Sequence, residues 1–524
     1  MFKQFRRKLA RWIAPVQKAQ TRQYGMAKGG RLTAGWGQST TSEDAELSSS
    51  LRKARDRSRE LIRDAAYAKR AKVIVQNNVI GPGIGMQAKV MTSRGELNDR
   101  INDQIESAWE AWCCASSCHT GGTLHFSDLE RQCMGQVFEA GEIFVRKHMR
   151  KFGDSAVPFA LEVIEPERIA DDVTPTMTNA TRTRLGIETD EFHRPVAYLI
   201  RTMHPGELRF NADQASAIER VPADQIIHLR IVERWPQTRA MPWMHAAARK
   251  LNDMDGLTEA EITAARGAAC YMGFIQSPAG DSNYGEEQPD GSSQVSLEPA
   301  FVEKLAPGEV FNFAAPNRPN AQLDPFMRMM LREVAAGTGC SYESLSRDYS
   351  QSNYSSSRLA LLDDRDLWRM LQLWFIRSFR QLIHKEWLQV AVMAQAIPAI
   401  NIQDYAVNPS KFEQVQFKPR GWSWIDPTSE VESYEKAIQC GFTTVTQVIA
   451  QTADGRDLED VLKERKRELE MMESMGLMFT TDPETLNQPA QQATSGPNSD
   501  TADSVVEEAE KMLREQSRGR VSHG

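Results

Sequence analysis

The sequence is poor in cysteine and contains no long apolar run. Its 524 residues include 7 cysteines, an odd number that does not suit a disulfide framework and favours reduced thiols in a cytoplasmic setting. The most apolar stretch, residues 390–400, falls short of the roughly 18 residues that a membrane-spanning helix needs. The net charge is only −7, so a large basic face that clamps duplex DNA is not expected. These absences predict no membrane partner and no tight grip on a nucleic acid.

Motifs for catalysis and phosphate binding are also missing. No Gly-Lys-Ser/Thr sequence occurs, so there is no Walker A loop, and there is no His-Glu-x-x-His helix or Gly-x-Ser-x-Gly elbow. The glycine-rich run at residues 81–85 lacks the spacing of a dinucleotide-binding loop. The adjacent carboxylates Asp363 and Asp364 do not share a helix face, so they make a poor acid–base pair. The sequence therefore predicts no catalytic residue and no cofactor.

One cluster of metal-binding residue types leaves an alternative open. Cys113, Cys114, Cys118 and His119 lie close together in the sequence, as the ligands of a metal-dependent hydrolase could. No second ligand pair follows at a recognisable spacing, and small buried thiols at the end of a helix explain the cluster equally well. We predict no metal site, and the hydrolase remains the alternative from another functional class.

The beginning of the chain is strongly basic. Residues 1–31 contain nine lysines and arginines and no acidic residue, and Phe2, Phe5, Leu9 and Trp12 recur at helical spacing. The segment lacks the apolar core and the cleavage site of a secretory signal. A basic arm over residues 1–42 that docks on an acidic partner, or that is simply solvated, fits this pattern.

The rest of the chain predicts an α+β fold. Helical patterns are expected at residues 43–76, 96–112, 126–139, 244–272, 323–336, 358–396 and 430–475. Short strands are expected at residues 142–149, 159–164, 195–201, 225–232 and 414–418. A small extended module is expected around residues 298–313, and the polar residues from 480 onward read as a disordered tail.

Residues 341–357 form the most unusual segment, because they are almost entirely Ser, Tyr, Asn and charged residues. The predicted helix at residues 358–396 follows directly and changes from charged to aromatic along its length. Arg347 and Arg358 with the neighbouring hydroxyls could touch a sugar-phosphate backbone without reading its sequence, and Tyr349 and Tyr354 add flat surfaces. By composition alone, a flexible and solvated connector explains the segment at least as well.

The same segment closely resembles the lambda-type family of tailed-phage portal proteins. The resemblance is carried by residues 331–339 (Leu-Arg-Glu-Val-Ala-Ala-Gly-Thr-Gly), 341–350 (Ser-Tyr-Glu-Ser-Leu-Ser-Arg-Asp-Tyr-Ser) and 352–358 (Ser-Asn-Tyr-Ser-Ser-Ser-Arg). Shorter runs at residues 58–64, 77–84, 234–243 and 304–309 agree with it. The similarity extends over residues 51–476.

This resemblance implies a ring of twelve subunits at one capsid vertex, with double-stranded DNA moving non-specifically through its axial channel. The domains that it implies are a wing (43–243), a stem helix (244–272), a clip (273–322), a second stem helix (323–340), a tunnel loop (341–357), a long wing helix (358–397), wing strands (398–429), crown helices (430–479) and a tail (480–524). A different ring-forming head-to-tail connector, without an internal channel loop, is the closest alternative.

The resemblance also implies particular contact residues and partners. The residues expected to face the DNA channel are Arg347, Asp348, Tyr349, Ser350, Asn353, Tyr354, Ser355 and Arg358. Those expected in the clip, which docks the large terminase subunit and then head-completion or adaptor proteins, are Glu298, Glu303, Lys304, Pro307, Gly308 and Glu309. Major capsid and scaffold proteins are further expected partners. Such a protein is assembled in the host cytoplasm and ends in the virion.

Overall fold

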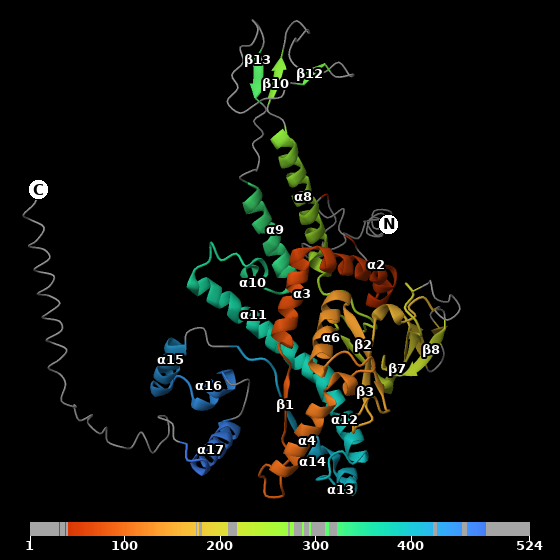
Figure 1. Ribbon diagram of the computed structural model, residues 1–524, viewed down its shortest axis with the longest axis vertical. Helices are drawn as coiled ribbons and strands as arrows, with labels where there is room; N and C mark the ends of the chain where they lie inside the picture. Colours follow the sequence, from red (N-terminus) through yellow and green to blue (C-terminus); the bar gives the residue numbers. More distant parts are fainter. Residues whose placement is uncertain are drawn as a thin grey trace, which may run out of the picture. The chain divides into compact units, whose positions relative to one another are not determined.

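The computed structural model describes residues 31, 37, 40–173, 176–177, 181–207, 217–270, 273–276, 286–287, 293–294, 310–313, 322–422, 427–452 and 458–477. The chain forms two compact units, Met1–Gly421 and Trp422–Gly524. Helices combine with small antiparallel sheets (Figure 1), which confirms the predicted α+β class. Within the described residues, no helix has the length and hydropathy of a membrane span. Most of the predicted N-terminal arm and all of the predicted tail lie outside the described residues.

The first long helix is interrupted at Ala65, so the single helix predicted over residues 43–76 is wrong. Helix α2 (Glu43–Asp64) ends where Ala65 adopts an extended conformation with φ −92° and ψ 121°, and α3 (Ala66–Val79) begins directly after it. Alanine has the highest helix propensity of all residues, so propensity does not place the break. Tertiary packing places the break. Helix α2 packs against α6 (Phe126–Ala140) and α8 (His245–Cys270), whereas α3 packs against α6, α10 (Tyr342–Ser346) and α11 (Tyr354–Phe375).

Two antiparallel sheets and three helices build the body of the predicted wing. The first sheet has the strand order β3–β2–β9, from β2 (Glu142–His148), β3 (Ala160–Ile164) and β9 (Ile226–Arg230). The second is a meander of β4 (Thr176–Met177), β5 (Arg182–Arg184), β6 (Ile187–Thr189), β7 (Pro195–Arg201) and β8 (Ile218–Pro222). The helices are α4 (Asp99–Trp112), α5 (Ala115–Cys118) and α6 (Phe126–Ala140), with 3₁₀ turns η2 (Pro166–Arg168) and η3 (Ala223–Gln225). The four strands predicted between residues 142 and 232 correspond to β2, β3, β7 and β9.

A buried ionic network joins α2 to the first sheet. The carboxylate of Glu142 on β2 lies 3.0 Å from a guanidinium nitrogen of Arg55 and 2.7 Å from one of Arg239, and all three side chains are almost fully buried. Arg230 donates to Nδ1 of His228 at 2.5 Å, which leaves the proton of the neutral ring on Nε2, where it is donated to Glu142 at 2.9 Å. Burial opposes ionisation, but Arg239, His228 and Arg55 outweigh it and lower the pKa of Glu142.

The predicted stem consists of two helices packed side by side (Figure 1). They are α8 (His245–Cys270) and α9 (Leu323–Thr338), close to the predicted spans. A Cβ atom placed on Gly337 would come within 3.1 Å of the Cβ of Ala247. Small residues at this crossing therefore set how closely the two helices approach.

The helix predicted over residues 358–396 begins earlier, at Tyr354, and ends earlier, at Met393, and it is not uniformly α-helical. It comprises α11 (Tyr354–Phe375), a π-helical segment η4 (Ile376–Arg380) and α12 (Gln381–Met393). Arg380, the last residue of η4, is buried, pairs with the buried Glu130 of α6 and lies over the rings of Phe126 and Phe417. Burial raises the pKa of Glu130 to about 6 although Arg380 acts in the opposite direction. The buried carboxylate of Glu130 is thus paired with a base held inside aromatic packing.

The remaining described elements are short. In the first unit they are β1 (Gly85–Ala88), which pairs with β14 (Val415–Lys418), and the helices α13 (Ile402–Val407) and α14 (Pro409–Phe412). Within the predicted clip, β10 (Gly273–Gln276) pairs with β13 (Val310–Phe313), and β11 (Glu286–Glu287) pairs with β12 (Ser293–Gln294). The second unit contains α15 (Pro427–Gln439), α16 (Val445–Thr452) and α17 (Leu458–Ser474), in the region predicted to be helical.

Candidate nucleic-acid interface

The polar segment predicted as a loop over residues 341–357 is largely ordered into helix ends. Helix α10 (Tyr342–Ser346) occupies its first part, and α11 already begins at Tyr354, so the irregular stretch is only residues 347–353. The term polar turn is used below for these seven residues. The prediction of one long loop is wrong because serine and asparagine act here as helix caps.

The caps are visible in the hydrogen bonds at each end of the polar turn. The side chain of Ser341 accepts from the backbone N–H of Ser344 at the start of α10. Asn353 and Ser356 form a reciprocal capping box at the start of α11. Between them, Arg347 ends α10 in the left-handed conformation with φ 58°. The same residue types that indicate a flexible linker by composition thus fix the turn at both ends.

A buried carboxylate on α11 holds α10 in place. Asp364 accepts hydrogen bonds from the backbone N–H of Ser341 at 2.8 Å, from its hydroxyl at 2.6 Å and from the hydroxyl of Ser344 at 2.8 Å. The carbonyl oxygen of Ser344 in turn accepts from the guanidinium of Arg70 on α3, at 3.3 and 3.4 Å. Burial raises the pKa of Asp364, while the serine hydrogen bonds lower it. The start of α10 is therefore fastened to two other helices.

A second carboxylate organises the polar turn itself. Asp348 accepts from the hydroxyl of Ser350 at 2.6 Å, from the backbone N–H of Ser350 at 3.1 Å and from the hydroxyl of Tyr342 at 2.8 Å. Arg328 on α9 lies 3.5 Å from the same carboxylate. These hydrogen bonds, with that of the Ser350 hydroxyl the largest contribution, lower the pKa of Asp348 to about 2. The turn is closed on itself and connected to the stem.

The eight predicted channel residues divide into three groups in this geometry. Asp348, Ser350 and Asn353 make the hydrogen bonds that shape the turn. Arg347, Tyr349 and Ser355 expose their side chains, with Tyr349 59% accessible. The remaining two are Arg358, which is half-buried in the first turns of α11, and Tyr354, whose side chain lies outside the described residues.

Sequence reasoning missed the residues that position this segment. Asp364, Arg70, Arg328 and Tyr342 all contact it, and three of them come from outside residues 341–357. The one local signal was the pattern of Ser and Asn at the positions preceding helical residues, which marks caps. The predicted clip residues Glu298, Glu303, Lys304, Pro307, Gly308 and Glu309 all lie outside the described residues.

The cysteine cluster does not assemble into a metal site in the described part of the chain. Cys113 and Cys118 are buried, the Sγ of Cys118 donates to the carbonyl oxygen of Cys113 at 3.3 Å, and burial raises the pKa of the Cys118 thiol to about 12. A thiol that stays protonated is a poor metal ligand. Nδ1 of His119 accepts instead from the backbone N–H of Thr123 and Leu124, at 3.4 Å each. The sequence-based hydrolase alternative therefore has no support in this geometry.

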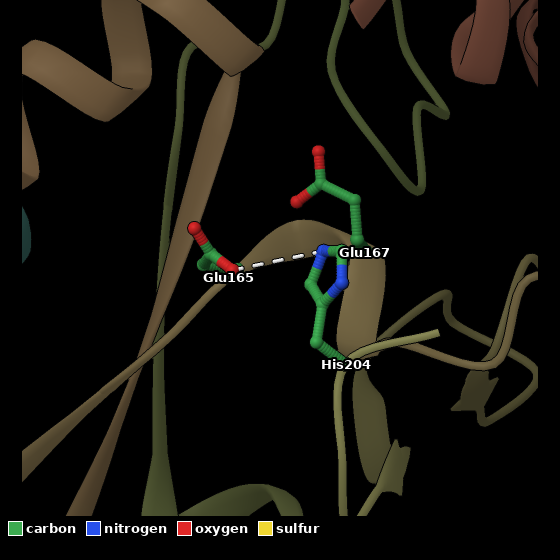
Figure 2. A group of neighbouring side chains, drawn as sticks. All are labelled: Glu165, Glu167 and His204. Atoms are coloured by element: carbon green, nitrogen blue, oxygen red, sulfur yellow. Dashed lines mark ion pairs between the residues drawn. The ribbon is translucent and has the colours of Figure 1, made fainter. Parts of the chain in front are cut away.

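A different group of side chains does lie close enough to share a cation. Figure 2 shows Glu165, Glu167 and His204, whose ligand atoms lie within 4.8 Å of one another. Arg59 already pairs with Glu167, with its Nε 2.9 Å from the carboxylate, and Nδ1 of His204 accepts from the backbone N–H of Gly206. Arg59 therefore already occupies the Glu167 carboxylate, and Nε2 of His204 lies 3.7 Å from Glu165, so the three side chains belong to an ion-pair network.

Comparison with known proteins identifies the family. The family model "Phage portal protein, lambda family" matches residues 29–372. A probable portal protein of Halomonas phage phiHAP-1 is 25% identical over 480 residues, covering 88% of this chain and 90% of its own length. Portal protein B of Escherichia phage lambda is 23% identical over 491 residues, covering 86% of this chain and 90% of its own length.

A solved structure, the virion of a native gene transfer agent particle, contains a chain that superposes with a TM-score of 0.44 at 13% identity, over 78% of this chain and 94% of that chain. The family model covers well over half of the sequence, including α9, α10, the polar turn and most of α11, and both relatives match it nearly end to end. This chain belongs to the lambda family of phage portal proteins.

Proposed function

We propose that this portal protein forms a ring of twelve copies at one vertex of a phage capsid, and that double-stranded DNA enters and leaves through its axis. The observation that carries the proposal is the polar turn, which is held rigidly from behind while Arg347 and Tyr349 project into solvent. A ring places one such turn from each subunit around the axis. In this assignment the protein is a virion component that is assembled in the host cytoplasm.

The chemistry of the turn suits a surface over which DNA slides. Each phosphate that a protein neutralises adds a salt-dependent attraction that movement along DNA must break. The exposed part of the turn offers one guanidinium, Arg347, and uncharged groups such as Tyr349 and Ser355. The carboxylate of Asp348 stays ionised beside them and adds local repulsion for phosphate. One cation and one nearby anion per subunit give a weak contact without base recognition.

The chain itself is proposed to have no catalytic role. The sequence has no Walker A loop, and burial raises the pKa of Cys113 and Cys118, two of the thiols that could have ligated a catalytic metal, so that they stay protonated. ATP hydrolysis for packaging then belongs to the large terminase subunit, docked on the clip through Glu298, Glu303, Lys304, Pro307, Gly308 and Glu309. After packaging, head-completion or adaptor proteins take the same place, and capsid and scaffold proteins surround the ring.

Negative-stain electron microscopy of the purified full-length protein tests this proposal most directly. Rings with a central channel are expected, with twelve subunits measured by the mass of the assembly. Monomers under every assembly condition would overturn the proposal. A ring that forms normally but whose polar turn lies on the outer surface would overturn the assignment of the turn to the channel.

A further inference from the structure

Helix α11 has one side buried in the protein and one side open to solvent. Asp364, Trp368, Leu371, Gln372 and Phe375 are all buried and recur every three or four residues, so they form one face. Through this face α11 packs against α3, and Gln372 donates to the carbonyl oxygen of Asn78 at 2.8 Å. The inner side of the helix is therefore fully occupied by its own subunit.

The outer side carries large apolar side chains. Leu359, Leu362, Met370 and Leu373 are 69%, 41%, 63% and 50% accessible, and they alternate with two exposed acids, Asp363 and Asp366. These six residues, called the α11 stripe below, lie on one face because their spacing follows the helical repeat. Four large apolar residues on one solvent-facing stripe form a patch of the kind that marks an interaction surface.

Helix α2 provides an internal comparison. Both helices contain 22 residues, and both bury one face against the same unit. Among the exposed residues of α2 there is no large hydrophobic side chain, whereas α11 has four. The outer face of α2 has the polar composition of a solvated helix. The composition of α11 indicates that another surface covers its outer face in the assembled protein.

The chain also carries an unpaired basic edge that complements the acids of the stripe. Within the described residues, Asp363 makes no ion pair within 4.0 Å, and Arg70, Arg332 and Arg347 have no carboxylate partner at that distance. Arg332 instead lies over the ring of Tyr342, at 5.4 Å. Burial and the charge of Arg347 both lower the pKa of Arg70, as expected for cations that share a neighbourhood without an anion.

The two surfaces cannot meet within one subunit. Asp364, on the buried face of α11, binds Ser341 and Ser344, and Ser344 is also bound by Arg70. The arginines therefore lie beyond the buried side of α11, and the stripe faces the opposite way. Two complementary surfaces on opposite sides of one subunit make a head-to-tail contact, which closes into a ring when the rotation between copies allows it.

We propose that the α11 stripe docks on a second copy of this chain, with its leucines and methionine covered by the neighbour and its acids facing the neighbour's Arg70 and Arg332. This inference rests on the proposed ring function and names the surface that builds the ring. Because the polar turn directly precedes α11, the same contact also orders the turns around the axis.

The test compares two double variants of the full-length protein that differ only in location. Leu359→Glu with Met370→Glu places two charges in the stripe. Met393→Glu with Val407→Glu makes the same chemical change on α12 and α13, where the side chains are 65% and 87% accessible. Circular dichroism melts establish that each variant folds, and mass photometry with negative stain measures assembly.

The stripe variant is expected to remain monomeric, or to need a roughly tenfold or higher protein concentration for ring formation. The control variant should assemble as the wild type does. Rings of the stripe variant at wild-type concentrations would overturn the inference. If the wild type itself forms no ring, the proposed function fails first, and the two failures are thereby distinguished.

Two further experiments test whether a second copy of the chain, or another part of the same protein, covers the α11 stripe. Reversing the acids, Asp363→Arg with Asp366→Arg, should weaken assembly, and adding Arg332→Asp should restore part of it. Deletion of the basic residues 1–31 should leave assembly intact. If that deletion alone reproduced the loss of rings, and the stripe substitutions then added nothing, the chain's own N-terminal arm would be the occupant and the inference would be wrong.

Discussion

Arg328 on α9 and Asp348 connect the predicted stem of this portal protein to its polar turn. The guanidinium of Arg328 lies 3.5 Å from the Asp348 carboxylate and 3.1 Å from Asp324, one turn earlier on α9. One arginine thus bridges a residue of its own helix and a residue of the turn. The position of the turn is coupled to α9 by a side chain that has a second partner available.

The hydrogen bonds of Asp348 should keep the polar turn ordered, and Asp348→Asn should release it. An amide offers one acceptor oxygen where the carboxylate offers two, so Ser350 and Tyr342 cannot both be satisfied as before. Hydrogen–deuterium exchange of peptides covering residues 346–356 should become faster, with little change in the melting temperature. Unchanged exchange would mean that the helix caps alone order the turn.

The same turn should be insensitive to pH in the neutral range. The native pKa of Asp348, about 2, lies below the ordinary aspartate value of about 3.9. Because the native pKa is lowered, the hydrogen bonds contribute fully above about pH 4 and are lost as the pH falls through about 2. Exchange rates of the turn, corrected for intrinsic chemistry, should be equal at pH 5 and pH 8. A marked rise at pH 5 would contradict this.

Asp364→Ala should destabilise the subunit by about 1–3 kcal/mol, because the Ser341 N–H and two half-buried hydroxyls lose their acceptor. Asp56→Ala, at an exposed position of α2, is the matched control and should change stability by about 0.5 kcal/mol or less. Urea unfolding at a fixed protein concentration measures both. Equal effects of the two substitutions would show that the Asp364 contacts contribute nothing net.

Glu142→Gln should be far more damaging than Glu219→Gln. Glu142 and both of its arginine partners are buried, so neutralising it leaves uncompensated charges at a cost of about 3–5 kcal/mol. Glu219 pairs with Arg146 at 2.7 Å but is 49% accessible, and its loss should cost about 1 kcal/mol or less. Thermal melts of the two variants give the comparison, and a cost at Glu142 no larger than at Glu219 would refute it.

Two buried histidines should make the fold sensitive to mild acid. Burial, aided by neighbouring arginines, lowers the pKa of His228 to about 3 and that of His384 to about 4. Since the unfolded chain takes up protons near pH 6.5, stability is complete above that pH and falls progressively below it, by on the order of 2 kcal/mol per histidine at pH 5.

The contribution of His384 can be isolated by substitution. Among the residues that the structure describes, its Nε2 has no hydrogen-bond partner, and its ring packs among Trp109, Trp387 and Phe417. His384→Phe should therefore reduce the loss of melting temperature between pH 7 and pH 5 while keeping the aromatic packing. An unchanged pH dependence would show that other groups control acid unfolding.

Arg347→Ala combined with Tyr349→Ala tests the turn as a DNA contact. Both side chains are exposed and neither makes the hydrogen bonds that shape the turn through its side chain, so the fold should be unaffected. DNA packaging or retention should be impaired in phage that carry these substitutions. Removing residues 348–355 should have a similar effect, and normal packaging by both would make the turn a plain connector.

The sequence predicts the types of the main elements well because their apolar repeats are long. The α+β class, the two stem helices and four wing strands follow from periodicity alone, and the family follows from the Ser/Tyr/Asn segment. Composition alone predicts the wrong local structure for that same segment, residues 341–357. Ser341 and Asn353 look like linker residues, yet each caps a helix, and only the distant Asp364 and Asp348 show why the segment is ordered.

Other differences also come from tertiary structure. The break at Ala65 has no propensity signal, because it reflects the different partners of α2 and α3. The π-helical segment ending at Arg380 belongs with a buried ion pair to Glu130, a residue 250 positions away in the sequence. Contacts across such separations are set by the fold as a whole, and local patterns do not contain them.

The hydrogen bonds from Ser341 and Ser344 to Asp364 also determine how a force on the polar turn is transmitted. Force applied to the turn by a moving polymer cannot be absorbed by stretching a slack linker, since α10 is fastened to α11 and α3. Such a force would instead act on α11, whose C-terminal end continues into the aromatic packing around Arg380. In the proposed ring, each subunit would then pass a force from moving DNA to the packing around Arg380.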